Sequence, residues 1–72
     1  MRVTYDKASD AAYIYFVSIP DGGVARTYPC DPIEVSGMIN LDFDNEGRLL
    51  GVEVLDASSK LPKELLAVAT TR

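Results

Sequence analysis

The sequence predicts a small α+β domain: an antiparallel β-sheet of four to five strands, arranged as a meander of hairpins, with one C-terminal helix packed on one face. Two observations carry this prediction. Apolar and polar residues alternate with a period of two through residue 55, which is typical of half-buried strands. Beyond residue 60 the apolar spacing changes to three and four, which indicates an amphipathic helix. With 72 residues, the chain is expected to form a single domain, residues 1–72.

The period-two part of the chain divides into strand segments separated by turn residues. The segments are 2–5, 12–17, 24–28, 33–43 and 48–55. Glycine, proline and aspartate fill the breaks between them, as in the polar connector 6–10, Pro20-Asp21-Gly22-Gly23 and Asp44-Asn45-Glu46-Gly47. Segment 33–43 is long for one strand, and Ser36-Gly37 inside it predicts a bulge or a sharp bend.

The second segment is apolar on both of its faces. Ile14 and Phe16 take one face, and Tyr13, Tyr15 and Val17 take the other. Monomeric proteins seldom expose a patch of adjacent large side chains, so we expect a central strand or a face covered by a partner. Tyr13, Tyr15 and Val17 are therefore the candidate interface.

The C-terminal helix is expected to carry an apolar stripe of Leu61, Leu65 and Val68, with Pro62 in its first turn. An isolated helix of this length is not stable in water, so the helix must dock on the sheet. One helix covers only one of the two sheet faces. The other face is then free to meet a partner.

Composition excludes several classes of function. The chain has no histidine and one cysteine, Cys30, so it lacks the commonest transition-metal ligand, the usual general base and any intrachain disulfide. We therefore expect no enzyme activity, no cofactor and no metal. The formal charge is −4, from 7 basic and 11 acidic residues, and the basic ones are scattered along the chain, which disfavours nucleic-acid binding.

Small domains without disulfides or metals usually gain stability by association, so a homodimer is expected. No apolar run approaches the roughly 20 residues that span a bilayer, and the first six residues lack the apolar stretch of a signal peptide. The expected location is the cytoplasm.

One stretch imitates a calcium site. Asp42-Phe43-Asp44-Asn45-Glu46-Gly47, followed by Glu53, reproduces the spacing of an EF-hand loop apart from Glu46. The flanking segments alternate as strands, and an extended chain would put Glu53 on the order of 20 Å from the turn. We therefore interpret the stretch as a hairpin turn whose Asp and Asn side chains bond to nearby backbone amides.

Other carboxylates are open to two interpretations. Asp6 and Asp10 could serve acid–base chemistry or hold a hard cation, but such residues more often cap and tighten turns. Asn40, Asp42 and Glu53 could line one face of the second hairpin as a polar patch. A small-ligand or metal-binding protein, or a minimal enzyme that uses Asp42, Glu53 or Asp6, is thus the alternative to an interaction module.

The segments 10–14, 37–44 and 47–58, together with Tyr5-Asp6, resemble the YuzE-like family of short bacterial and archaeal proteins, domain of unknown function 2283 (DUF2283). The stretch Gly47-Arg48-Leu49-Leu50-Gly51-Val52-Glu53-Val54-Leu55-Asp56-Ala57-Ser58 is its most specific part. The resemblance implies a compact antiparallel sheet with a C-terminal helix and carries no catalytic residue. Because some members are thought to be encoded beside small toxin-like proteins, it also suggests an antitoxin-like role. The chain departs from the usual pattern over 21–35, which is less acidic here.

These observations predict an uncharacterised, non-enzymatic protein–protein interaction module. The expected partners are a second copy of the chain and a small partner protein, with no nucleic acid and no membrane.

Overall fold

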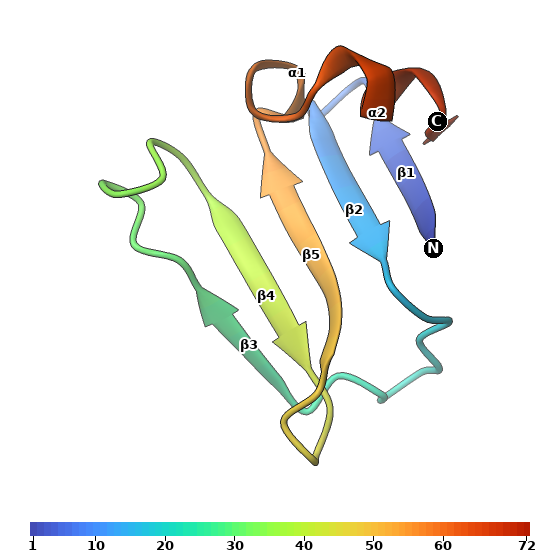
Figure 1. Cartoon of the computed structure of the whole chain (residues 1–72), viewed down its shortest axis with the longest axis vertical. Helices are drawn as coiled ribbons and strands as arrows, with labels where there is room; N and C mark the ends of the chain where they lie inside the picture. Colours follow the sequence, from blue (N-terminus) through green and yellow to red (C-terminus); the bar gives the residue numbers. More distant parts are fainter.

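The computed structural model describes the whole chain, residues 1–72. It contains six strands and two short helices: β1 (Arg2–Asp6), β2 (Ala11–Tyr15), β3 (Arg26–Pro29), β4 (Ile39–Phe43), β5 (Leu49–Leu55), α1 (Ala57–Lys60), α2 (Lys63–Ala67) and β6 (Thr70–Thr71). The strands form one sheet in the order β3-β4-β5-β2-β1-β6 (Figure 1). The sheet-dominated α+β class is as predicted. The sheet is mixed rather than purely antiparallel, because β6 runs parallel to β1.

The predicted meander is wrong for the middle of the chain. Residues 16–25 carry the chain from β2 to the far edge of the sheet, where β3 begins, and β5 then returns to pair with β2 (Figure 1). The backbone N–H and C=O groups of a central strand need partners on both sides, and β2 obtains them from β1 and β5. This long-range pairing leaves no trace in local periodicity. The prediction that β2 is central is confirmed.

The predicted strand 33–43 forms only in its second half. Residues 33–37 are a turn, in which the Asp31 carboxylate accepts a hydrogen bond from the Ile33 amide at 2.9 Å. The Gly37 amide donates to the Pro32 carbonyl at 3.0 Å, and Ser36 adopts a left-handed φ of 52°. The bend expected at Ser36-Gly37 is therefore present, but the chain before it is coiled rather than extended.

The single predicted helix is two short helices. Pro62 disfavours helical backbone at the residue before it, and Leu61 is extended with φ −101° and ψ 148°. Helix α1 therefore ends at Lys60, and α2 begins directly after Pro62. Val68, assigned to the apolar stripe, is 76% exposed, because the chain leaves α2 there to form β6.

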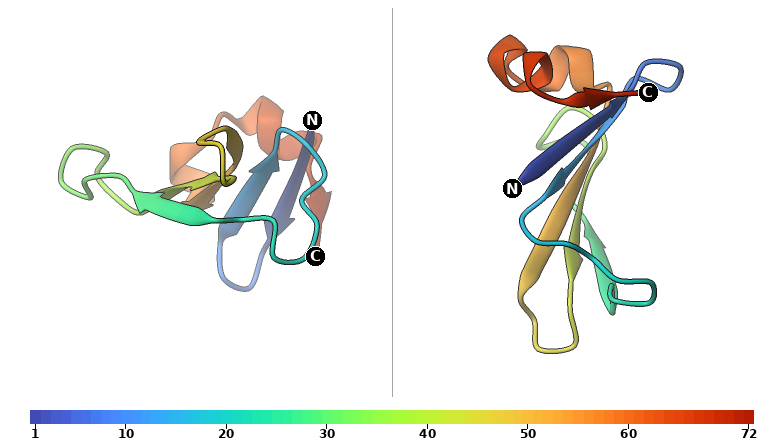
Figure 2. Two further views of the ribbon diagram at one scale, coloured as in Figure 1. Left: turned by 90° about the horizontal axis from the view of Figure 1, so that it is seen from below. Right: turned by 90° about the vertical axis from the view of Figure 1, so that its right-hand side faces the viewer.

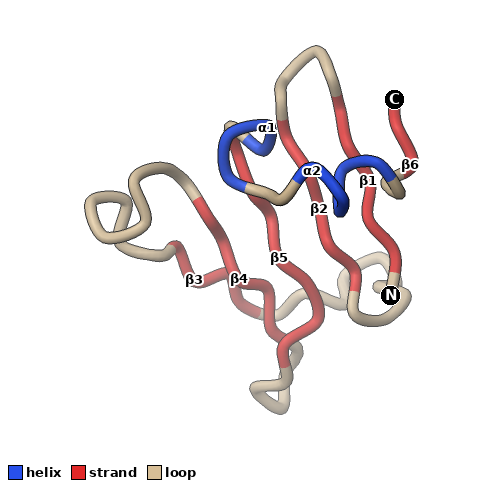
Figure 3. Tube along the Cα trace, turned by 45° about the horizontal axis from the view of Figure 1, so that its top comes forward, coloured by secondary structure: helices blue, strands red, loops and turns tan.

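The helices cover only one end of one face of the sheet (Figures 2 and 3). Strand register places a row of four side chains under them, Tyr5, Ala12, Val54 and Ile39. Ala57, Leu61 and Leu66 pack against this row, and Ala57 is fully buried. The buried core cluster, Ala12, Val54 and Ala57, lies at this end of the sheet. None of the helices is long and apolar enough to cross a membrane, and the cytoplasmic location stays a prediction.

Candidate functional site: the polar face of the sheet

The sheet face opposite the helices carries two rows of polar and aromatic side chains, which we call the polar face. Strand register sets out both rows. The first row is Thr4, Tyr13, Glu53 and Asn40, and the second is Arg2, Tyr15, Gly51, Asp42 and Thr27. Side chains of a strand alternate between faces, so every member of these rows points away from the helix-covered core. Five strands thus contribute to one continuous surface.

Tyr13 and Asp42 lie at the centre of the polar face and are hydrogen-bonded to each other. The Tyr13 hydroxyl donates to Oδ2 of Asp42 at 2.5 Å, across the intervening strand β5. The residue of β5 between them is Gly51, which is the direct register partner of Asp42. The other carboxylate oxygen of Asp42 accepts a hydrogen bond from the Thr27 hydroxyl at 2.6 Å. Both oxygens of Asp42 are therefore satisfied by neighbouring side chains.

The chemistry open to Tyr13 follows from its surroundings. Burial and the hydrogen bond to the Asp42 carboxylate raise the pKa of Tyr13 well above its ordinary value. The hydroxyl therefore stays protonated at neutral pH and acts as a hydrogen-bond donor rather than as a base or nucleophile.

Asn40, Asp42 and Glu53 share the polar face, as predicted. The amide of Asn40 donates to Oε1 of Glu53 at 2.9 Å, between directly paired residues. Asp6 lies apart from them, and its carboxylate accepts a hydrogen bond from the Ala8 amide in the β1–β2 turn. No group of three or more His, Cys, Asp or Glu side chains is arranged so that it could hold a metal ion.

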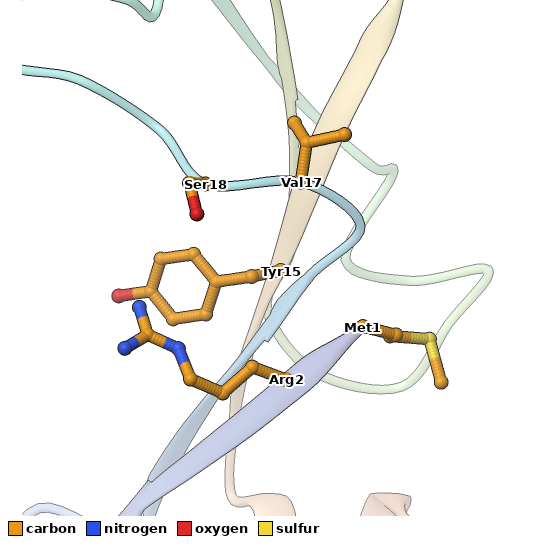
Figure 4. A pocket seen from close by; sticks show the side chains of 5 residues that line it. All are labelled: Met1, Arg2, Tyr15, Val17 and Ser18. Atoms are coloured by element: carbon orange, nitrogen blue, oxygen red, sulfur yellow. The ribbon is translucent and has the colours of Figure 1, made fainter.

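Of the three residues of the candidate interface, Tyr13 and Tyr15 lie in β2 and Val17 follows its end. The rings of Tyr13 and Tyr15 are 4.5 Å apart between centroids. Tyr15 and Val17 line a small hollow of about 200 Å³, in which the Arg2 guanidinium faces the Tyr15 ring at 4.2 Å (Figure 4). Val17 follows the last residue of β2 by two positions and is 52% exposed. The arrangement puts a cation–π pair at this end of the polar face.

A second, shallow hollow of about 490 Å³ lies where the segment 19–24 faces Tyr13, Tyr15 and Asp42. The segment turns sharply, since the Gly23 amide donates to the Pro20 carbonyl at 2.8 Å and Gly22 has a left-handed φ of 73°. The predicted break at 20–23 is confirmed.

Asp10 is a structural latch rather than part of a site. It has a left-handed φ of 53°, and its carboxylate accepts hydrogen bonds from the Tyr5 hydroxyl at 2.7 Å, the Ser58 amide at 3.0 Å and the Ser58 hydroxyl at 2.7 Å. These bonds hold the pKa of Asp10 below its usual value. The β1–β2 turn is thereby tied to the start of α1, as the turn-tightening interpretation of Asp10 predicted.

The EF-hand-like stretch is a hairpin turn. The Asp44 carboxylate accepts hydrogen bonds from the amides of Glu46 and Arg48, both at 2.9 Å. Gly47 supplies a left-handed φ of 78°. Glu53 is five residues further along β5 than Arg48 and is bonded to Asn40. The turn interpretation is confirmed by these bonds.

Sequence reasoning missed the contacts that organise the polar face, namely Tyr13 with Asp42, Thr27 with Asp42, and Arg2 with Tyr15. One signal could have pointed to them. An isolated glycine inside a strand often marks a close approach by another group, and Gly51 is such a residue.

The fold and site together define a small sheet protein, latched at one end by Asp10 and Ser58, with a polar face on one side and a partly covered apolar face on the other. The model of the family described as protein of unknown function (DUF2283) matches residues 2–58, and the chain belongs to this family. No curated protein and no solved structure matches the chain. The matched segment ends at Ser58, the residue bonded to Asp10, so α2 and β6 lie beyond it.

Several residues in the segments that resemble the family have structural roles. Asp10 and Ser58 form the latch, Ala57 is fully buried, and Gly51 leaves room for the ring of Tyr13. These residues maintain the fold.

Proposed function

We propose that this chain is a non-enzymatic protein–protein interaction module. The observation that carries the proposal is the amount of apolar surface that its own helices leave uncovered. Phe16 is 42% exposed and Tyr28 is 58% exposed, although register and strand alternation put both on the face that bears the core. Exposed apolar patches of this kind mark interaction sites more often than they remain free.

Both faces of the sheet offer surfaces for a partner. The polar face presents Tyr13 and Tyr15 beside hydrogen-bonding groups, and Val17, the third residue of the candidate interface predicted from the sequence, lies just beyond the end of β2. Tyrosine is enriched at protein interfaces because it joins a large apolar ring to a polar tip. The opposite face presents aliphatic and aromatic side chains. A module that binds through both faces is consistent with these two surfaces.

Photo-crosslinking from two adjacent positions tests the proposal. Tyr15 and Phe16 follow each other in sequence, and strand alternation sends them to opposite faces. Replacing each in turn by p-benzoylphenylalanine in the producing cell places the same probe on either side of the sheet. We expect a discrete protein adduct from at least one position. No adduct from either position, in cells that contain the folded protein, would contradict the proposal.

An antitoxin-like role is the narrower form of the proposal. Its support is the net charge of −4 and the two carboxylates, Asp42 and Glu53, on the polar face, which suit a small basic partner. Such a partner would be crosslinked from position 15 and lost at high salt, because exposed charge pairs are screened. Crosslinking from position 16 alone would contradict the antitoxin-like form while leaving the interaction module in place.

A second candidate is a small-ligand-binding protein. The hollow of about 490 Å³ beside Tyr13, Tyr15 and Asp42 falls within the size range of small-molecule sites. A thermal-shift screen with calcium, magnesium and common metabolites tests this function. A ligand at 100 times its dissociation constant stabilises a protein by about 2.7 kcal/mol, which is a readily measured shift.

A further inference from the structure

The helix-bearing face has an uncovered half, which we call the open apolar face. Register aligns Val3, Ile14, Val52, Leu41 and Tyr28 in one row across five strands. Val3 is buried and Val52 packs against the core, so the row opens toward the β3 edge, where Tyr28 is exposed. Phe16 and Phe43 extend the face beyond this row, further from the helices. The two helices lie over the opposite end of the sheet (Figure 2). We infer that two copies of this chain pack open apolar face against open apolar face, with their helix pairs at opposite ends of the dimer. The inference rests on the proposed function and deepens it.

The charge on this face favours a second copy as the occupant. The chain as a whole carries −4, but none of the side chains that register places on the open apolar face is a carboxylate. Arg26, the register partner of Phe43, lies at the edge of this face and is stacked over the Phe43 ring at 5.2 Å. A two-fold interface sets the same patch against itself, so like charges there would repel. The row from Ile14 to Tyr28 has no charged side chain, so two copies of it can face each other without repulsion.

The solvent-accessible area of the chain is larger than that of a typical monomer of the same mass. The chain exposes 4920 Å², whereas a monomeric globular protein of 7.8 kDa exposes about 4,400 Å². The excess of about 500 Å² per copy gives about 1,000 Å² for two copies, which is the lower limit for a specific interface. An interface of this size is smaller than the roughly 2,000 Å² or more that is usual for obligate dimers, so we expect a reversible dimer.

The position of the helices fixes the orientation of the two copies. Packed sheets lie about 10 Å apart, and a helix with its side chains is itself about 10 Å thick. Two helix pairs stacked over the same end would need about twice that separation. The two-fold axis must therefore run across the strands, which places each helix pair beyond the open end of the partner's sheet.

Sedimentation equilibrium with a matched pair of variants tests the interface. Tyr28 and Thr27 are neighbours on the edge strand β3 and point to opposite faces, so Tyr28→Lys and Thr27→Lys make the same charge on the two sides. Both residues are exposed, and circular dichroism checks that both variants fold. We expect a wild-type dimer, a dissociation constant raised about tenfold or more by Tyr28→Lys, and a smaller change with Thr27→Lys.

A wild-type monomer at about 100 µM would overturn the dimer, as would equal effects of the two lysines. This failure is distinct from failure of the proposed function. A heterologous adduct from position 16 would retain the interaction module and replace the second copy as its partner.

The orientation is tested by a distance between spin labels at Ser59→Cys in a Cys30→Ser background, since Ser59 lies on the exposed side of α1. The two open halves lie one over the other and span about four residues, or about 13 Å, along the strands. Half the thickness of a helix on either side adds about 10 Å, which predicts about 23 Å between the two helix pairs. A distance near the 8–10 Å spacing of packed helices would overturn the opposite-end arrangement.

Discussion

The ring of Tyr13 lies across Gly51 of the neighbouring strand, so that a β-carbon at position 51 would lie 2.5 Å from Cε1 of Tyr13 and 2.6 Å from its hydroxyl oxygen. The same β-carbon would lie 2.7 Å from the Ile14 carbonyl oxygen. The missing side chain is what lets the Tyr13 hydroxyl cross β5 and reach Asp42 on β4. Gly51 is thus required by close approach, because its φ is not left-handed.

Gly51→Ala is expected to destabilise the protein by about 1–3 kcal/mol, the usual cost of forcing extra atoms into a packed contact. Denaturant unfolding monitored by circular dichroism measures the change in the free energy of unfolding. The same substitution in a Tyr13→Ala background should cost less, because the ring is gone, but more than zero, because the Ile14 carbonyl remains. Equal costs in the two backgrounds would show that the ring does not define the space at Gly51.

Loss of the Asp10 latch is expected to loosen the helical end of the molecule. Asp10→Ala removes three hydrogen bonds and leaves alanine at a left-handed φ that alanine disfavours. Asp10→Asn keeps part of the hydrogen bonding, and asparagine tolerates that φ. The melting temperature should therefore fall in the order wild type, Asp10→Asn, Asp10→Ala. Hydrogen exchange at the Ala57 amide, which donates to the Asp10 carbonyl, should accelerate in the same order. An Asp6→Ala control removes only a bond within the turn and should have a smaller effect.

The protein is expected to lose stability in acid. Hydrogen bonds from Tyr5 and Ser58 lower the pKa of Asp10, and backbone amides of Arg48 and Glu46 lower the pKa of Asp44, both from a value of 3.8. A carboxylate whose pKa is lowered on folding contributes stability above its unfolded value and loses it as the pH falls through the lower folded value. The free energy of unfolding should therefore decline below about pH 4. Asp10→Asn and Asp44→Asn should each flatten this decline, and an unchanged slope in both variants would contradict the assignment.

Two of the four tyrosines are expected to resist ionisation in alkali. The hydrogen bond to Asp10 raises the pKa of Tyr5, and burial with the bond to Asp42 raises the pKa of Tyr13, both from 10.0. A group whose pKa is raised on folding contributes stability below its unfolded pKa and loses it as the pH rises through the folded value. Stability should therefore fall above about pH 10. Absorbance at the phenolate band should show late-titrating tyrosines that disappear in Tyr5→Phe and Tyr13→Phe, and a single early titration would contradict the two hydrogen bonds.

Much of the architecture was predictable because it follows from nearest neighbours along the chain. Alternation through residue 55 gave the strands, and the turns at 20–23 and 44–47 followed from glycine, proline and aspartate chemistry. Failures occurred where a local pattern allowed two outcomes. Residues 33–37 alternate like a strand, but Pro32 and the Asp31 side chain turn them into a coil. Leu61 fits a helical stripe, but Pro62 after it holds it extended.

The candidate site was predictable only in part. That Tyr13 and Tyr15 share a face, and that Asn40, Asp42 and Glu53 share a face, follows from period two. That these two sets lie on the same face of one sheet does not follow, because it depends on β5 pairing with β2.

The family, most of the strand segments, the turns at 20–23 and 44–47, and the side chains that alternate together could be read from local sequence, since all of these depend on bonds and spacings within a few residues. Only the tertiary structure decided that β5 pairs with β2, that β6 joins the sheet in parallel, and that the helices cover one end of one face. Those outcomes depend on long-range burial and on the need of each backbone group for a hydrogen-bond partner. As a result, the open apolar face stays uncovered and Tyr13 reaches Asp42.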